Sequence, residues 1–466
     1  MKIIVPVINH SSNVSLYIQI YDFIRKEILA GFIKPNEKLP SLRLLAKEMA
    51  LSITTIELAY QQLMVEGYIY AKPQSGYFVS HIATQQPKPE RILQEQAFAK
   101  FAQLQFSLSS SIDKTIMMDT TSFDFYKWKK CTAKILTDYS HLLLDEGAPQ
   151  GEDVLRYQIA KYVYESRSVR CDYEQVVIAA GTQQITNFLC MILANIDISH
   201  AVVEQPGYKP VQNIFSDRGF KLLPIPVLQD GIDLNILPVN IRSVAYVTPS
   251  NQFPTGSIMP IGKRYKFLEW AKKNNSYIIE DDYDSELRYF GRPIPSLQGL
   301  DQEERVIYLG SFSSTLFPAI KISYMILPHV FVPIFQKIAK NYTQTCSKTE
   351  QLTLALYMEQ GLFQTHIKKL RKANAQKLRL TISCLQKIFN STVSPLDNQS
   401  GLQLQVKIKT QQSADYLCQT ARSVGIDMKY LSSKKHNEVI LVFYYAKIPL
   451  DNIDAAIKVL AQQWNL

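Results

Sequence analysis

The 466-residue sequence lacks the cysteine pattern of a disulfide framework or a zinc site. It has no C-x-x-C pair, and no histidine stands at ligand spacing from a cysteine. Scattered cysteines of this kind are typical of reduced thiols in a cytoplasmic protein, so we predict neither a metal site nor a secreted scaffold. The six cysteines are Cys131, Cys171, Cys190, Cys346, Cys384 and Cys418.

A long uninterrupted hydrophobic run is also missing. The most apolar stretch, residues 320–338, contains Lys321, Pro328, His329 and Pro333, which exclude a membrane-spanning helix. The first nine residues are mixed and are followed by polar residues, which does not match a secretory signal. The sequence therefore predicts no membrane partner and a cytoplasmic location.

The composition that is present is that of a globular protein, with 46% hydrophobic and 20% charged residues. A chain of this length is expected to form two or three domains. The formal net charge of +10 and the isoelectric point near 9.0 point to polyanionic partners.

Residues 1–80 are predicted to form a separate domain. Residues 15–30 carry apolar side chains at helical spacing, Ser41 is a typical N-cap of a second helix, and a third helix begins near Ser52. Two segments of alternating residues follow, joined across residues 73–75, and this pattern indicates a β-hairpin. Three helices and a hairpin predict a winged helix-turn-helix.

Such a domain would bind double-stranded DNA. The third helix has to enter a major groove with short hydrogen-bonding side chains at its N-terminus, while cations contact phosphates and fix the position without reading sequence. The alternative is a small helical interaction domain with a hairpin. The predicted DNA-binding residues are Arg43 of the second helix, Ser52, Thr54 and Thr55 of the third, and Lys72, Ser75 and Gly76 of the wing.

This segment resembles the GntR-type winged helix. LPSLRLLAKEM, TTIELAYQQLMVEGYI and QSGYFV match the family pattern in order, from Leu16 to Val79. Many relatives carry an arginine near the start of the recognition helix, whereas Ile53 interrupts the Ser-Thr-Thr run here. Base readout is therefore expected to rest on the hydroxyls and on Arg43.

Residues 81–106 are predicted to be a linker. The segment is polar, contains Pro87 and Pro89, and shows no apolar period before Ala97. We expect it to be extended at first and helical afterwards.

Residues 107–466 are predicted to be an α/β domain around a mostly parallel sheet. Five apolar runs, each suited to a strand buried on both faces, alternate with helical stretches. Ligands of such folds bind beyond the carboxyl ends of the strands. The five runs are residues 176–180, 201–205, 243–249, 276–282 and 305–311.

Polar motifs follow these strands. Residues 180–184 form a strand-to-helix turn, which suits an anion, and Tyr208 at a loop apex can stack on a flat ring. Asn251 can hydrogen-bond a ring substituent. The carboxylates around Tyr283 lack the ordered spacing of a metal site, but one of them can hold a pyridine nitrogen protonated. Taken singly, each motif also fits a turn that binds nothing, loop packing or a solvated loop.

A serine-rich turn follows the last of these strands. Its hydroxyl and N–H groups can cradle an anion that Lys321 would neutralise. A plain loop between two buried strands fits the same segment equally well. The residues concerned are Ser311, Ser313 and Ser314.

In this order, the motifs resemble the fold type I aminotransferases that use pyridoxal 5'-phosphate (PLP), and most closely the MocR family of bacterial regulators, in which that fold is fused to a GntR head. The resemblance runs from about Phe123 to the C-terminus and includes EGAPQGEDVLRYQIAKYV. It implies a head-to-tail homodimer. It also implies a cofactor site in which Gly181, Thr182, Gln183, Ser311 and Lys321 hold the phosphate, Tyr208 stacks on the ring, Asp281 faces the pyridine nitrogen, Tyr283 and Asn251 bond O3', and Ser313 and Ser314 complete the turn.

The chain departs from that family at three places. Relatives have S-F-S-K where this chain has Ser311-Phe312-Ser313-Ser314, and a serine hydroxyl cannot replace the lysine that forms the Schiff base with PLP. Lys321 stands where relatives use a phosphate-binding arginine, so the bidentate fork is lost. The strand EVILVFYYA also lacks the relatives' arginine for a substrate carboxylate.

The sequence thus predicts no catalytic residue. It predicts a sequence-specific transcriptional regulator whose aminotransferase-like domain dimerises and senses a small-molecule effector. That effector is PLP or a B6–amino acid adduct, bound noncovalently. The alternatives are an active PLP-dependent aminotransferase that uses another lysine, and a dimerisation scaffold that binds no ligand.

Overall fold

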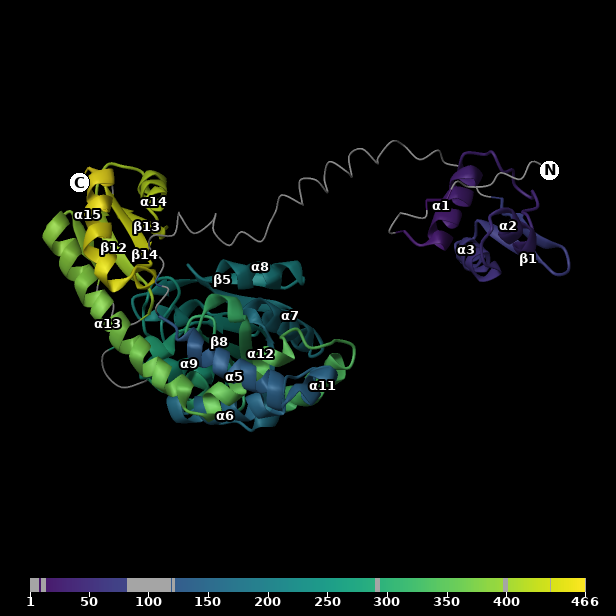
Figure 1. Cartoon of the computed structure of the whole chain (residues 1–466). Coiled ribbons are helices and arrows are strands. Elements are labelled where there is room, and N and C mark those ends of the chain that lie inside the picture. Colours follow the sequence, from purple (N-terminus) through teal and green to yellow (C-terminus); the bar gives the residue numbers. More distant parts are fainter. Residues whose placement is uncertain are drawn as a thin grey trace. The chain divides into compact units, whose positions relative to one another are not determined.

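The computed structural model describes residues 8–9, 14–81, 119, 122–289, 294–396, 401–435 and 437–465. The chain divides into two compact units, residues 1–108 and 109–466, each of which is described by itself (Figure 1). Apart from His81, the predicted linker lies outside the described residues. No helix in the described ranges combines the length and apolarity needed to cross a membrane.

The first unit is a winged helix-turn-helix, as predicted. Ile56, Tyr60 and Leu63 of the third helix are fully buried against the first two helices and the hairpin, and the Tyr60 hydroxyl donates to the Pro40 carbonyl at 3.0 Å. The elements are α1 (Leu16–Leu29), α2 (Leu42–Glu48), α3 (Ile53–Val65), β1 (Ile69–Lys72) and the antiparallel β2 (Gly76–Val79).

The second unit is built on an eight-stranded sheet of order β3-β10-β9-β8-β7-β4-β5-β6. Strands β5, β4, β7, β8 and β9 are parallel, whereas β10 and β6 run antiparallel to their neighbours, so the sheet is mixed. The strands are β3 (Val176–Ala180), β4 (His200–Gln205), β5 (Lys221–Leu228), β6 (Gly231–Ile232), β7 (Val244–Val247), β8 (Tyr277–Asp282), β9 (Val306–Ser311) and β10 (Ile322–Ile326).

The antiparallel direction of β10 decides which of its residues lie at the carboxyl edge of the sheet. Because β10 lies between β3 and β9, its first residue stands beside their last ones, and Ile322 pairs with Ala180. Lys321, directly before β10, therefore reaches the edge at which the parallel strands end. Sequence patterns predicted β3, β4, β7, β8 and β9 correctly but not the direction of β10.

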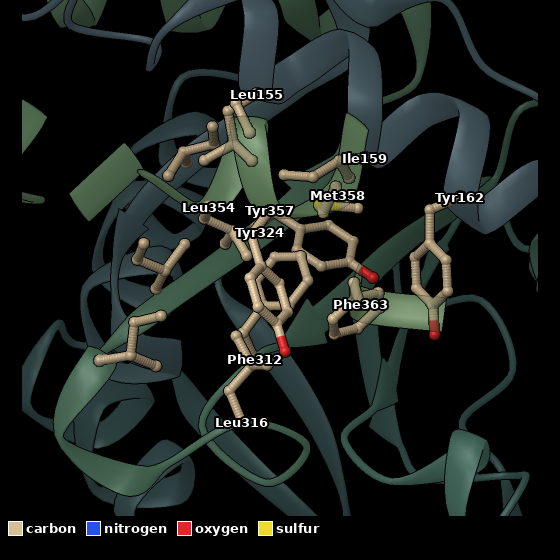
Figure 2. Packing of buried hydrophobic residues seen from close by; sticks show 14 of the residues in the cluster. Leu155, Ile159, Tyr162, Phe312, Leu316, Tyr324, Leu354, Tyr357, Met358 and Phe363 are labelled. Carbon is tan, nitrogen blue, oxygen red and sulfur yellow. The ribbon is translucent and has the colours of Figure 1, made fainter. Parts of the chain in front are cut away.

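Helices cover both faces of this sheet. They are α5 (Phe125–Asp138), α6 (Asp153–Arg167), α7 (Gly181–Ala194), α8 (Lys209–Asp217), α9 (Ile261–Lys273), α10 (Leu297–Leu300), α11 (Val332–Ala339) and α12 (Lys348–Glu359). Figure 2 shows the cluster formed between the sheet and helices α6 and α12. Phe312 belongs to it, with its ring 5.5 Å from those of Tyr324 and Phe363.

A long helix, α13 (Leu362–Phe389), leads to a smaller C-terminal sheet (Figure 1). That sheet is antiparallel, in the order β11-β12-β14-β13, and packs on α13, α14 and α15 through a separate apolar core. The elements are β11 (Val393–Pro395), β12 (Leu404–Lys409), α14 (Ala414–Ser423), β13 (Met428–Lys435), β14 (Glu438–Phe443) and α15 (Ile453–Trp464).

Candidate functional site

The first turn of α3 presents the predicted base-reading hydroxyls. Ser52 caps the helix, since its Oγ accepts the Thr55 N–H at 3.1 Å and lies 2.7 Å from Thr55 Oγ1. Ser52 and Thr54 are exposed, and Thr55 is half-buried. Capping uses the Ser52 and Thr55 hydroxyls locally, so Thr54 is the hydroxyl most available to an external partner.

The remaining head candidates are exposed cations and wing residues. Arg43 lies in the first turn of α2, where Ser41 Oγ accepts the Leu44 N–H at 3.2 Å. Lys72 Nζ lies 4.8 Å from the centre of the Phe78 ring. Ser75 and Gly76 form the hairpin turn, and Gly76 has a φ of +102°, a backbone conformation that favours glycine.

A cavity of about 410 Å³ lies at the carboxyl edge of the large sheet. Every predicted cofactor-binding residue lines it except Asn251. The lining residues are Ala180, Gly181, Thr182, Gln183, Tyr208, Thr248, Phe253, Asp281, Tyr283, Ser311, Ser313, Ser314, Lys321 and Ser323.

One side of the cavity is rich in hydrogen-bond donors. Helix α7 begins there at Gly181, and the N–H groups of a first helical turn have no partner within the helix. Lys321 adds a positive charge, and it forms no ion pair with a carboxylate of the described residues. Helix terminus and ammonium group together make this side suited to an anion.

The backbone of Lys321 is held in an unusual conformation. Its φ of +50° lies in the left-handed region, which costs a non-glycine residue about 1 kcal/mol or more. The Cys346 thiol donates to the Lys321 carbonyl at 3.8 Å, and β10 starts at the next residue. The fold therefore fixes the point from which this side chain projects.

The serine-rich turn is anchored by Phe312, which is buried in the core and leaves the serines at the cavity. Ser311 Oγ accepts from the Ser323 hydroxyl at 2.9 Å and from the Ser313 N–H at 3.3 Å. The Ser314 hydroxyl donates to the Tyr283 carbonyl. Ser314 is thus tied to the segment that carries Tyr283.

Asp281 lies in the cavity wall at the end of β8 and is 6% exposed. The Tyr246 hydroxyl donates to Asp281 Oδ2. Burial raises the pKa of Asp281 to about 7, although the hydrogen bond from Tyr246 lowers it. A cationic group on a ligand would reverse the effect of burial and keep this carboxylate ionised.

A second buried carboxyl, Glu204, lies next to the cavity at the end of β4. Its Oε2 accepts from the Thr248 hydroxyl at 2.7 Å, the Thr248 N–H at 3.2 Å and Gln252 Nε2 at 3.1 Å. Burial raises its pKa to about 7. Glu204 therefore fixes the turn that presents Thr248 and Phe253 to the cavity.

Asn251 lies behind the cavity wall. Its Nδ2 donates to Asp284 Oδ2 at 2.6 Å and lies 3.3 Å from the Tyr283 hydroxyl. Gly401, between β11 and β12 of the C-terminal sheet, packs so closely that a Cβ there would lie 2.7 Å from Asn251 Nδ2. Asn251 therefore touches both the Tyr283 side chain and the C-terminal subdomain.

A buried ion pair supports the end of β8 from the opposite face. Arg167 Nε donates to Asp282 Oδ2 at 2.6 Å, and the Tyr308 hydroxyl donates to the same oxygen at 2.6 Å. Both charged side chains are almost completely buried. This pair fixes the backbone between Asp281 and Tyr283.

Sequence reasoning missed Thr248, Phe253, Ser323 and the supporting Glu204. Phe253 lies edge-on to the rings of Tyr208 and Tyr283, with centroids 5.7 and 6.1 Å away. Its position in the same TPSNQFPTG segment as Asn251 was the available signal. Ser323 had none, because its place depends on the antiparallel pairing of β10 with β9.

Two family models match the chain. The model "Aminotransferase class I and II" matches residues 127–444, and the model "Bacterial regulatory proteins, gntR family" matches residues 16–79. A curated relative, the uncharacterized HTH-type transcriptional regulator YdeL of Bacillus subtilis, is 36% identical over 99% of this chain and 100% of its own length. The chain belongs to the MocR-type regulators.

Other curated relatives also match this chain over most of their length. The probable rhizopine catabolism regulatory protein MocR of Rhizobium meliloti is 29% identical over 91% of this chain and 88% of its own. The pyridoxine biosynthesis regulator PdxR of Corynebacterium glutamicum is 27% identical over 91% and 90%. This MocR-type protein is therefore a DNA-binding transcriptional regulator with an aminotransferase-like domain.

Solved structures confirm the predicted fold. Kynurenine aminotransferase of Pyrococcus horikoshii matches with a TM-score of 0.64 at 22% identity, over 83% of this chain and 97% of its own. The α-aminoadipate aminotransferase LysN of Thermus thermophilus matches with a TM-score of 0.64 at 21% identity, over 80% and 98%. The second unit has the fold type I aminotransferase architecture.

Proposed function

We propose that the aminotransferase-like domain of this regulator binds a phosphorylated B6 compound, PLP or its amino acid adduct, without a covalent bond, and that this ligand changes how the heads bind DNA. The observation that carries the proposal is one cavity with an anion-binding side at Gly181 and Lys321 and a buried carboxyl, Asp281, in its wall. A phosphate and a pyridine nitrogen are the two groups that such an arrangement recognises. The name of one relative refers to pyridoxine biosynthesis.

The residues present fit this cofactor as a ligand. The first turn of α7, Ser311 and Lys321 would hold the phosphate, while the ring would lie against Tyr208 with its nitrogen toward Asp281. Tyr283 would bond the phenolic oxygen, and Asn251, whose Nδ2 lies 3.3 Å from the Tyr283 hydroxyl, would orient it from behind the cavity wall. Bound to an enzyme, PLP acts as an electron sink; here the chain's groups bind and orient it.

Ser314 supports the noncovalent mode. It occupies the position at which the family resemblance implies a Schiff-base lysine, and its hydroxyl already donates to the Tyr283 carbonyl. Lys321 is the single lysine among the described residues that line the cavity, and the phosphate would engage it. The described part of the chain places no second lysine in the cavity wall for a covalent anchor, which argues against transamination.

We also propose a homodimer. Helices α5 and α6 and the short 3-10 helix η2 (Ser140–Leu144) surround a second, largely apolar cavity of about 520 Å³. Several large side chains that line it are exposed, among them Tyr139 (39%), Val154 (55%) and Tyr157 (58%). An apolar face of this kind favours burial against a second copy. Sedimentation of Tyr157→Lys tests it: we expect a shift to monomer, and an unchanged dimer would place the interface elsewhere.

A spectral and calorimetric titration tests the ligand proposal. The protein and its Ser314→Lys variant would be titrated with PLP, pyridoxamine phosphate and pyridoxal, followed by borohydride. We expect saturable binding of the phosphorylated compounds to both proteins. With PLP, Ser314→Lys alone should turn yellow, and borohydride should bleach this colour and leave PLP bound to the lysine through a stable C–N bond. A fixed adduct in the parent protein would support the enzyme reading, and no binding to either protein would support the scaffold reading.

A DNA-binding measurement tests the regulatory part. The protein should retard a fragment of its own upstream region in a salt-dependent way and in preference to competitor DNA. A ligand acts on DNA binding only through different affinities for two arrangements of the heads, so saturating PLP should change the DNA affinity. An unchanged affinity would contradict its role as effector.

A further inference from the structure

The positive charge of this regulator lies mostly outside its DNA-binding head. Residues 1–80 contain eight Lys or Arg residues and six Asp or Glu residues, whereas the whole chain has 51 and 41. One of the eight, Arg25, already has partners within the head. Its Nε donates to the Tyr68 hydroxyl at 3.1 Å, and its Nη1 lies 3.7 Å from Asp22 Oδ1. The head therefore brings little net charge to a polyanion.

Helix α13 is a strongly positive element of the second unit. Its 28 residues include seven Lys or Arg residues and no Asp or Glu. Lys368, Lys369 and Lys372 are exposed within one turn of each other near its N-terminal end. Lys368 and Lys372 are spaced i and i+4, where like charges repel and destabilise a helix slightly.

Helix α5 extends this positive region. Both α5 and α13 pack on α12, and the His366 ring of α13 lies 5.1 Å from the Phe123 ring just before α5. Desolvation raises the pKa of Asp124, but the backbone hydrogen bond of Lys127 and the charges of Lys127 and Lys369 together lower it. Lys127 of α5 and Lys369 of α13 therefore both lie close enough to Asp124 to lower its pKa.

We define the α5–α13 basic surface as the exposed residues Lys130, Lys134, Lys368, Lys369 and Lys372. None of them forms an ion pair with a carboxylate in the described part of the chain, whereas Lys127 lies 3.4 Å from Asp124 Oδ2. Exposed lysines without an ion-pair partner, on two helices that both pack on α12, attract counterions or a polyanionic partner.

We propose that the α5–α13 basic surface binds the phosphate backbone of DNA that lies outside the sequence read by the heads. DNA is the polyanion that this regulator already binds. Lysines are flexible point charges, which suits phosphate contacts rather than base readout. Each contact releases counterions, so the surface adds affinity and salt dependence and no sequence preference.

The test compares two charge-matched triple variants of the full-length protein. One is Lys368→Gln, Lys369→Gln, Lys372→Gln on the α5–α13 basic surface. The control is Lys221→Gln, Lys266→Gln, Lys340→Gln, which removes three exposed lysines elsewhere on the second unit. Affinity would be measured against salt on a long duplex and on a short one that covers the head-binding sequence alone, with sedimentation and thermal unfolding as checks on assembly and folding.

We expect the slope of log affinity against log salt on the long duplex to become shallower by up to about 3 in the surface variant, at about 0.9 for each lost phosphate contact. The control variant should leave this slope close to that of the parent. On the short duplex, all three proteins should behave alike.

Equal changes in both triple variants, or no change in either, would overturn the proposal. If the surface variant bound anionic lipid vesicles with a shallower salt dependence than the parent but kept the parent's slope on DNA, the partner of this surface would be a membrane instead. Failure of the parent to bind even the short duplex would be a failure of the head, which is a different result.

Discussion

Replacing Asp281 with asparagine should make the protein more stable and less able to bind its ligand. Burial raises the pKa of this carboxyl from 3.8 to about 7. A carboxyl with a raised folded-state pKa stabilises the fold only while protonated, so its contribution is complete below about pH 4 and is lost as the pH rises through 7. At about 1.4 kcal/mol for each pKa unit, the ionised group costs up to about 4 kcal/mol above pH 7.

The asparagine side chain avoids this cost and still accepts a hydrogen bond from Tyr246. Residues 109–466 should unfold with an entropy near 0.75 kcal/mol/K, so 4 kcal/mol corresponds to roughly 5 °C. We therefore expect Asp281→Asn to raise the unfolding midpoint of the second unit by up to about 5 °C at pH 8 and to leave it almost unchanged near pH 4. Differential scanning fluorimetry across this pH range measures both values.

Ligand binding should move in the opposite direction. The parent protein should gain thermal stability with PLP at pH 8, because a protonated ring nitrogen compensates the Asp281 carboxylate, and Asp281→Asn should lose most of this gain. Glu286→Gln is the matched control, since burial raises the pKa of Glu286 to about 7 and the residue lies outside the cavity lining. It should be stabilised at pH 8 and keep the PLP shift. A destabilised Asp281→Asn, or one with the full PLP shift, would refute this reasoning.

Three other substitutions test the framework of the site and the head. Arg167→Met leaves the buried Asp282 carboxylate without its ion-pair partner. The free energy of unfolding of the second unit, measured by chemical denaturation, should fall by about 3 to 5 kcal/mol. Gly401→Ala places a methyl group against Asn251 Nδ2 and forces a positive φ on alanine, so PLP affinity measured by calorimetry should fall about tenfold or more. Ser52→Ala removes the N-cap of α3 and should lower the stability of the head by about 0.5 to 2 kcal/mol, with weaker retardation of DNA in native gels.

The head could be predicted almost completely from its sequence. Capping residues, a period of 3.6 and an alternating hairpin are local signals, and Ser41 and Ser52 make the cap hydrogen bonds that their positions suggest. The hydroxyl pairing between Ser52 and Thr55 could not be predicted, because it depends on the rotamers of two side chains in the folded turn.

In the second unit, the strand ends were predictable and their three-dimensional context was not. Parallel strands bring their carboxyl ends to one edge, which places Gly181, Tyr208, Asp281 and Ser311 around one cavity. The direction of β10 and the approach of Gly401 to Asn251 depend on contacts between segments far apart in sequence. Patterns within one segment carry no information about such contacts.

The acidic residues of β8 favour our proposal of a bound ligand over a ligand-free scaffold. Side chains alternate along a strand, so Glu280 and Asp282 face one side and Asp281 faces the other. On the first side each carboxylate has an arginine, with Arg264 3.9 Å from Glu280 and Arg167 2.6 Å from Asp282. Asp281 faces the cavity and forms no ion pair with any described residue. A cationic ring nitrogen bound in the cavity, as we propose, would supply the positive charge that Asp281 lacks.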